Sequence, residues 1–550
     1  MVLGDCYCCA KMPDRGLEVF LGKPSENAFA GDAADVQETS ELSWSVPDEA
    51  REVSMTSIPA PETSPEDIWE DPWHPVLGRH ILLMTQMLAT RPQVVRGIRI
   101  FRVLQGGPRD WMQGALHRLH ADSEVTTSLD EFWCHSWHIH PAAKYFSVVF
   151  LNNGFAAFVV GTLSAGLAFS LCVAGLLHSA GACTLCGTGG YYLTLLLWQR
   201  WKLVFLDIAC IHQTDVQVKL EGLVSIGAFL KKSRTLLVLW DPTLVSRLWC
   251  IFEMAAFLHS CEFDAQKDVK ICPVLVGPVF LLGHFGLCVL MVIYAYAPVP
   301  LVPFWPWGGL LVAMLALPCL TLFAYVLLVF CSNIETMQKQ VRYFKVEGSS
   351  SQCCTRNHVD PTTGQRTICD RSIIGRCITK WFGSSELFES VVRSKLLEIL
   401  VDHLANRTFS YWRIVQATSP VLWSVLDLIL VNVETWSNAV LSLMLYWLAV
   451  LPSIALVCIR LAYQVRLLCS GTLARVLVAV GLVTIGSVMF LSCFMLQWAV
   501  IDAVYASTSL YVESMVLSTA GLLIVAGTCT VLLWWCMPVI HISAPESLEG

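Results

Sequence analysis

Two long stretches of this chain contain no charged residue, and they constrain its fold more than any other feature. Neither 145–199 nor 271–334 contains Asp, Glu, Lys or Arg. A helix that crosses the hydrocarbon core of a membrane needs about 20 apolar residues, so each stretch has room for a hairpin of two spans. Charged residues make up only 14% of the whole chain, against about 25% in soluble domains. The sequence therefore predicts an α-helical multi-pass membrane protein.

The number of spans depends on the segment 419–434, which is apolar but contains Asp427. Arg460, Arg466 and Arg475 lie between two later spans, and cytoplasmic loops carry an excess of Lys and Arg. If 419–434 crosses the membrane, these arginines face the same side as both polar blocks of the chain. We therefore favour about eight spans over seven, with both termini cytosolic. The predicted spans are 155–177, 180–198, 278–296, 308–331, 419–434, 435–459, 476–501 and 514–540.

The negative charge of the chain is concentrated before the first span. Thirteen acidic residues and one arginine lie between Glu26 and Asp71, within a Pro- and Ser-rich segment, 1–75, whose composition is typical of a disordered tail. The following segment, 76–127, has a helical and partly basic pattern. No dense stripe of Lys and Arg is present, so nucleic acid is not an expected partner.

The first polar block has the pattern of an α/β domain. Short apolar runs and helical patterns alternate in the order strand 202–207, helix 220–232, strand 235–240, helix 246–259 and strand 269–275. Such alternation implies a parallel sheet. One more predicted strand, 130–137, lies upstream and is separated from the others only by the first membrane hairpin. We therefore expect one α/β domain that a transmembrane hairpin interrupts.

Two motifs in this block carry a family resemblance. Ser246-Arg-Leu-Trp-Cys-Ile-Phe-Glu-Met254 resembles the Ser-x-x-Trp-Cys-x-x-Glu-Leu motif of TIR domains, and Phe132-Trp-Cys-His-Ser-Trp137 is similar to their first-strand box. The split arrangement also resembles a family of multi-pass membrane proteins of dinoflagellate-type algae. The resemblance implies a TIR-like module over 128–277, interrupted by the hairpin 150–198, which signals or acts as a scaffold through self-association.

The resemblance also implies a candidate active site. In catalytic TIR domains the glutamate of the motif is needed to cleave the nicotinamide–ribose bond of NAD, and it matches Glu253. A carboxylate there would stabilise an oxocarbenium-like transition state. Open α/β sheets bind ligands at the carboxyl ends of their strands, and the expected pocket comprises His135, Ser136, Asp207, Trp240, Trp249 and Cys250. The alternative is a scaffold in which Trp249 and Cys250 pack the helix on the sheet while Glu253 faces solvent or caps a neighbour.

The second polar block contains a cluster of potential metal ligands. Five cysteine and histidine residues occur within 25 positions, and structural zinc takes four such ligands. For a zinc ion we predict Cys354, His358, Cys369 and Cys377. Ordinary reduced cysteines are the alternative. Downstream, the residues 386–406 are predicted to form a helix with one apolar face.

Three functions from different classes remain open at this stage. The first is a membrane-anchored TIR-like signalling or scaffold protein with the lipid bilayer and further copies of itself as partners. The second is a membrane-tethered NAD hydrolase that uses Glu253, with NAD as its substrate. The third is a transporter or channel, because ionisable residues inside a membrane often mark such pathways. The predicted organisation is 1–75 tail, 76–127 helical segment, 128–277 split module, 278–331 second hairpin, 332–418 cytosolic Cys/His-containing region, 419–540 C-terminal bundle and 541–550 tail.

Overall fold

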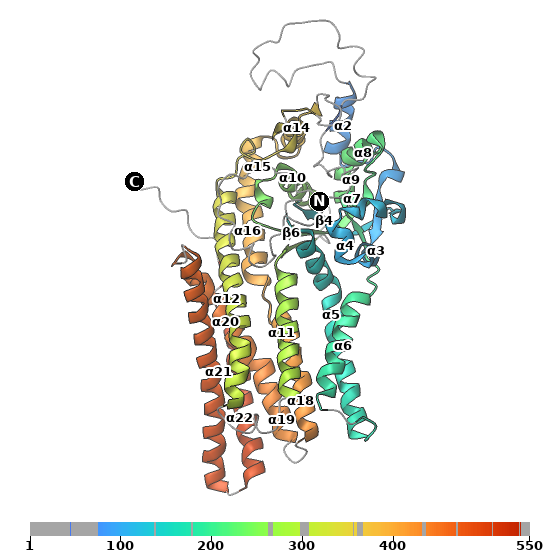
Figure 1. Ribbon diagram of the computed structural model, residues 1–550. Coiled ribbons are helices and arrows are strands. Elements are labelled where there is room, and N and C mark those ends of the chain that lie inside the picture. Colours follow the sequence, from blue (N-terminus) through green and yellow to red (C-terminus); the bar gives the residue numbers. More distant parts are fainter. Residues whose placement is uncertain are drawn as a thin grey trace, which may run out of the picture.

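The computed structural model consists of an α/β module and a bundle of long helices (Figure 1). It describes residues 44–45, 75–136, 139–177, 180–261, 268–296, 307–355, 357–359, 367–431, 436–468, 471–508, 510–537 and 539–540. The tail 541–550 and nearly all of the tail 1–75 lie outside the described residues. Within the N-terminal tail, β1 (Trp44–Ser45) pairs antiparallel with β8 (Thr367–Ile368).

A six-stranded sheet forms the centre of the module. Its spatial order is β3 (Glu124–Val125), β2 (Arg96–Arg99), β5 (Leu203–Phe205), β4 (Leu129–His135), β6 (Ser233–Trp240) and β7 (Asp268–Pro273). Strands β5, β4, β6 and β7 are parallel, whereas β2 pairs antiparallel with both β3 and β5. The four strands predicted from the sequence are thus confirmed, and they lie side by side in one sheet.

The hydrogen bonds of this sheet join segments on both sides of the first membrane hairpin. Strand β4 precedes the hairpin and pairs with β5 and β6, which follow it. On one face of the sheet the rings of Phe132 and Phe205 stack with centroids 4.6 Å apart, and Phe229 packs on Phe205 at 4.2 Å. A single hydrophobic core therefore requires both halves of the interrupted domain.

The prediction of a helical segment at 76–127 is wrong in part, because this segment is only partly helical and belongs to the α/β module. It contributes β2 and β3 to the sheet, where Gly97 and Ile98 are buried. The two arginines that flank this pair interrupt the apolar run, so the hydrophobic pattern of the sequence does not indicate a strand here. Arg99 forms an ion pair of 2.7 Å with Glu124, and the module accordingly begins near residue 75. Its helices before the first span are α2 (Pro75–Thr85), η3 (Pro92–Val94), α3 (Ile100–Gln105), α4 (Gly107–Met112) and η4 (Ala115–Asp122).

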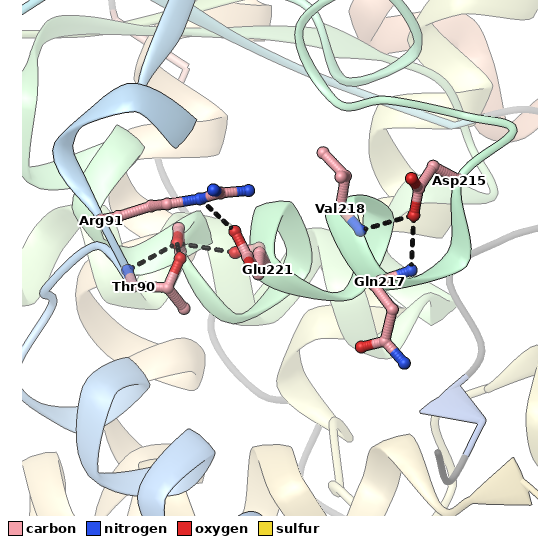
Figure 2. A network of polar contacts seen from close by, with 7 residues as sticks. Thr90, Arg91, Asp215, Gln217, Val218 and Glu221 are labelled. Atoms are coloured by element: carbon pink, nitrogen blue, oxygen red, sulfur yellow. Dashed lines mark hydrogen bonds and ion pairs between the residues drawn. The ribbon is translucent and has the colours of Figure 1, made fainter. Parts of the chain in front are cut away.

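The helices between the later strands follow the predicted alternation with one break. They are α7 (Asp207–Cys210), α8 (Val216–Val224), α9 (Ile226–Lys232), η5 (Leu244–Ser246) and α10 (Leu248–Cys261). The helix predicted at 220–232 is divided at Ser225, whose side chain accepts a hydrogen bond from the Thr90 backbone N–H. Figure 2 shows this contact region, in which Arg91 pairs with Glu221 at 2.7 Å and Asp215 caps α8. These contacts attach the N-terminal part of the module to α8.

Among the described residues, six helices are long and apolar enough to cross a membrane. Five of them lie in single elements, namely α5 (Pro141–Val173), α11 (Val276–Tyr296), α12 (Trp307–Arg342), α21 (Thr472–Thr508) and α22 (Tyr511–Cys536). The sixth is a continuous run of four elements, α19 (Trp436–Leu443), η9 (Met444–Val450), α20 (Leu451–Val465) and η10 (Arg466–Leu468). The pair α17 (Tyr411–Ala417) and α18 (Ser419–Val431) qualifies only as one span bent by 48°, and α6 (Ala182–Leu197) is a shorter apolar helix. The class of helical membrane protein predicted from the sequence is therefore supported.

Small residues let the first hairpin pack closely on α18. A Cβ atom at Gly187 would lie 2.6 Å from the indole of Trp423, and one at Gly161 would lie 2.9 Å from the Gly187 carbonyl oxygen. Trp423 is fully buried there. Without a hydrophobic driving force between helices, close contact of this kind is what holds membrane helices together. The bent pair is thus an integral part of the bundle.

Replacing Gly277 with alanine is expected to destabilise the protein by about 1–3 kcal/mol, the usual cost of overpacking. A Cβ atom at Gly277 would lie 2.3 Å from the Ser147 Cα atom and 2.6 Å from the Phe146 carbonyl oxygen, so the backbones of α5 and α11 would have to separate. Gly283 is the control, because it lies in the same helix with nothing within 4 Å of an added Cβ. Thermal unfolding in detergent should show a loss for Gly277→Ala and none for Gly283→Ala; equal melting temperatures would contradict this packing.

The second polar block forms a helical layer beside the module. Its elements are α13 (Gln352–Thr355), α14 (Asp370–Phe382), α15 (Ser385–Val391), η6 (Val392–Leu396), α16 (Leu397–Val401) and η7 (Asp402–Arg407). The last four run without interruption, which confirms the helix predicted at 386–406. Helix α14 packs on α10 and α2, where Phe252 and Trp381 stack with centroids 5.3 Å apart. This layer therefore contacts the helix that carries the Trp-Cys-x-x-Glu motif.

Candidate functional site

The carboxyl ends of the parallel strands face the helix bundle. Helix α5 begins at Pro141, shortly after β4 ends at His135, and α11 begins at Val276, shortly after β7 ends at Pro273. Both helices run from the sheet into the bundle (Figure 1). Ligands of open α/β sheets bind outside the carboxyl ends where the winding direction reverses. In this strand order the reversal lies between β4 and β6, directly above the first span.

Five of the predicted site residues come together at this edge. The Cys250 thiol donates to the His135 carbonyl oxygen at 3.8 Å, which joins α10 to the end of β4. Ser136 lies next in the chain, and its hydroxyl is 3.3 Å from that of Thr243. Glu253 interacts electrostatically with Asp207, which follows β5. The site therefore draws on β4, β5 and the motif helix α10, as expected from the sequence.

Two predicted pocket residues point elsewhere. The ring of Trp240 packs edge-on against Phe330 of α12, with centroids 6.2 Å apart. The indole N–H of Trp249 donates to the Asp370 carboxylate at 3.2 Å, on the side of the second polar block. Both indoles are buried. The alternative prediction, that Trp249 packs the motif helix in place, describes its position, whereas Glu253 turns toward the strand ends.

Three side chains that the sequence did not single out complete the cluster. Lys144, on the first turns of α5, is buried and interacts electrostatically with Asp207. Arg247 donates to the Ser136 hydroxyl at 3.3 Å, and the Cys134 thiol hydrogen-bonds to Glu253. Lys144 is the last charge before the run 145–199, a place where a lysine is usually an interfacial anchor. Only the folded module shows that Lys144 is buried next to Asp207 at the end of the sheet.

Burial dominates the electrostatics of Glu253. Removal from water raises its pKa to about 8, an effect that the Cys134 thiol and the Arg247 charge oppose and the Asp207 charge reinforces. A carboxylic acid with this pKa is mostly protonated at neutral pH, when it can donate a hydrogen bond. Glu253 nevertheless retains partial exposure, while Phe252 and Met254 on either side are buried. Part of the residue therefore lies at the surface, while the surroundings of its carboxyl group keep that group largely neutral.

The neighbouring groups respond to the same burial. Desolvation, followed by the positive charge of Lys144, lowers the pKa of His135 to about 3, so its imidazole is neutral. Burial raises the pKa of Asp207 to about 6, although the Ile208 N–H donates to its carboxylate at 2.7 Å. At neutral pH the cluster thus offers one carboxylate, one carboxylic acid, a neutral imidazole and two cations. Such a set suits a polar ligand with hydroxyl groups and negative charge.

A second cluster of functional side chains lies in the Cys/His-containing region. Ligand atoms of Cys353, Cys354, His358 and Cys369 all lie within 4.8 Å of one another. Three of these four residues were predicted as ligands. Cys377 was predicted as well, but it is buried in the apolar core on α14 and is not a member of this group. Cys353 takes the fourth place, because its thiol on the short helix α13 lies 3.9 Å from that of Cys354.

Asp427, on α18 of the bent pair, has a structural role in the described part of the bundle. It is buried, and its carboxylate accepts hydrogen bonds from the backbone N–H groups of Cys183 and Thr184 at 2.8 and 2.9 Å. The Thr184 hydroxyl donates to it at 2.8 Å. These are the free donors at the N-terminus of α6, so Asp427 caps that helix from a distant part of the chain. This capping role explains the buried acid without an ion pathway.

The comparisons with known proteins add no relative. No protein-family model, no curated protein and no solved structure matches this chain. Function is therefore inferred from the geometry of the described residues.

Proposed function

We propose that this protein is a membrane-anchored, TIR-like signalling protein that acts through assembly of its cytosolic α/β module. The observation that carries the proposal is the position of the Trp-Cys-x-x-Glu helix α10, which follows β6 in a doubly wound sheet of order β5-β4-β6-β7. The motif residues also have distinct tasks, since Trp249 anchors the helix and Glu253 faces the strand ends. The strand order thus supports a doubly wound α/β module, and the motif on α10 carries the resemblance to TIR domains.

The proposed topology has about eight spans, with both termini and both polar blocks in the cytosol. It requires α6 and the bent pair α17–α18 to cross in addition to the six long helices. An even number of crossings before β5 is necessary if β4 and β5 are to share one sheet. In this arrangement, α5, which carries Lys144, connects the site to the membrane.

The open edge of the sheet is the surface that we propose for assembly with a second copy. Strand β7 packs against η7, whereas both residues of β3 at the other edge are exposed, including Val125. An open edge can pair with a strand of another chain. We expect the full-length protein in nanodiscs to form dimers or larger assemblies when its concentration is raised, measured by mass photometry and crosslinking.

The variant Val125→Lys should weaken this assembly, and Thr127→Lys, an exposed neighbour outside β3, should not. Lysine at a sheet edge opposes edge-to-edge pairing. If the wild-type protein stays monomeric at all concentrations, and gives no crosslinked dimer when copies are brought together, the assembly proposal is refuted. Equal assembly of both variants would place the contact elsewhere on the module.

A second candidate function is cleavage of NAD at Glu253. The observation that favours it is the partial exposure of Glu253 next to Asp207, with the cations Lys144 and Arg247 in the same cluster. A carboxylate can bind the ribose and stabilise the positive charge that develops when the glycosidic bond breaks. The cations would offset the charge of the diphosphate. NAD turnover by the purified protein decides between a catalytic and a purely scaffolding module.

A further inference from the structure

We propose that a structural zinc ion is bound in the second polar block and fixes the start of α10. Its four ligands are Cys353, Cys354, His358 and Cys369. This site is independent of the proposed function, because neither assembly of the module nor NAD chemistry requires it. It corrects the ligand set expected from the sequence by replacing Cys377 with Cys353.

The spacing of the sulfur atoms fits a tetrahedral metal centre. The Cys354 Sγ atom lies 3.9 Å from Cys353 Sγ and 3.7 Å from Cys369 Sγ. With zinc–sulfur bonds of about 2.3 Å, two ligands of a tetrahedron are about 3.8 Å apart. A disulfide would bring two sulfur atoms to about 2.05 Å. The three thiols are therefore held at the separation of metal ligands and not at that of a cystine.

The histidine completes the set at a strained turn. Its Nδ1 atom is buried and has no hydrogen-bond partner among the described residues. Asn357 and His358 have φ angles of 51° and 57°, in the left-handed region that is uncommon for residues other than glycine. The His358 N–H donates to the Cys353 carbonyl oxygen at 2.8 Å, which closes the turn. A metal–nitrogen bond would satisfy the buried Nδ1 and offset the strain.

Hydrogen bonds around the thiols connect the site to α10. The Asp370 N–H donates to Cys353 Sγ at 3.2 Å, and the Ser351 hydroxyl lies 3.1 Å from the same sulfur. Ser351 also donates to the Asp370 carboxylate, as does the indole N–H of Trp249. Next to it, the Leu248 N–H donates to the Ser350 carbonyl oxygen at 3.1 Å. Outer partners of this kind orient the ligands of metal centres, and here they hold the first turn of the motif helix.

The first experiment measures zinc in the full-length protein purified in detergent without added metal. We expect about one zinc per chain, as in other four-ligand structural sites, and a loss of roughly tenfold or more in zinc affinity for Cys369→Ser and His358→Ala. Cys377→Ser is the matched control and should retain the metal. Cobalt exchange should give the thiolate charge-transfer absorption of a tetrahedral site. Loss of metal from Cys377→Ser with retention in Cys353→Ser would overturn the ligand assignment.

A second experiment needs no variant and so avoids any failure to fold. Chelation of the wild-type protein should lower its melting temperature and speed amide hydrogen exchange in 246–253, and added Zn²⁺ should restore both. Absence of metal from the purified protein, together with no response to Zn²⁺ or Co²⁺, would overturn the proposal. A Cys354–Cys369 disulfide in the protein as purified under reducing conditions, detected by mass spectrometry, would do so as well. Unchanged exchange in 246–253 after metal loss would refute the link to α10.

Discussion

Replacing Asp427 with alanine is expected to lower the free energy of unfolding by about 2–4 kcal/mol, because loss of a helix cap costs about 0.5–2 kcal/mol and buried donors left without a partner add to that cost. The substitution strands the Cys183 and Thr184 N–H groups and the Thr184 hydroxyl inside the bundle. Unpaired backbone groups are costly where water is absent. The N-terminus of α6 should fray, and α18 should lose its polar contact with the hairpin. Unfolding of the purified variant by heat or by SDS in mixed micelles measures the change.

Asp502→Ala provides the control for this prediction. Asp502 is also an acid within a long apolar helix, α21, but its side chain is exposed. It should change the stability by no more than about 0.5 kcal/mol, the usual effect of a surface substitution. Equal effects of the two variants would refute a capping role for Asp427. A stable Asp427→Ala protein with altered ion flux in liposomes would instead favour the transporter hypothesis.

Replacing Glu253 with glutamine is expected to reduce any cleavage of NAD by roughly 100-fold or more, the usual loss when a group that stabilises transition-state charge is removed. Because burial raises the pKa of Glu253 to about 8, the side chain is mostly neutral at pH 7. Glutamine is therefore a close substitute in shape and charge, and the variant should fold normally. The reactive form is the carboxylate, so wild-type turnover should rise with pH up to about 8.

Glu221→Gln serves as the control for NAD turnover, since Glu221 pairs with Arg91 on the surface of α8. Its rate should equal that of the wild type. Turnover that survives Glu253→Gln would refute catalysis at this site. No turnover by the wild type, also in clustered form, would exclude the hydrolase and leave the scaffold as the function of the module.

The membrane class and the four parallel strands could be predicted from the sequence because each depends on a local pattern. Charge-free runs reveal spans, and a short apolar run such as 235–240 reveals a buried strand whatever its partners are. The strand order was not accessible in this way. It depends on pairing across the first hairpin, for example between Phe132 of β4 and Leu236 of β6, and no local pattern records that pairing.

The errors have a common physical cause, which is that side-chain direction depends on distant segments. Trp249 was expected in the pocket, but Asp370, far along the chain, accepts its indole N–H. The sequence gives no sign of a role for Lys144, because its acidic partners, Asp207 and Asp241, follow other strands. Cys377 was chosen over Cys353 on spacing alone, and only the turn at His358 shows which thiols meet.

If a membrane hairpin divides one α/β domain, the two halves of the domain must lie on the same side of the membrane, and the side on which each half lies is therefore the most direct test. A protease recognition sequence can be inserted at Thr127, before β4, at Thr214, after β5, and at Gly175, in the turn of the hairpin; all three are exposed. In sealed vesicles of known orientation, we expect the Thr127 and Thr214 sites to be cut from the cytosolic side and the Gly175 site only from the other. Cleavage of the Thr127 and Thr214 sites from opposite sides would contradict the account, because β4 and β5 could not then share a sheet.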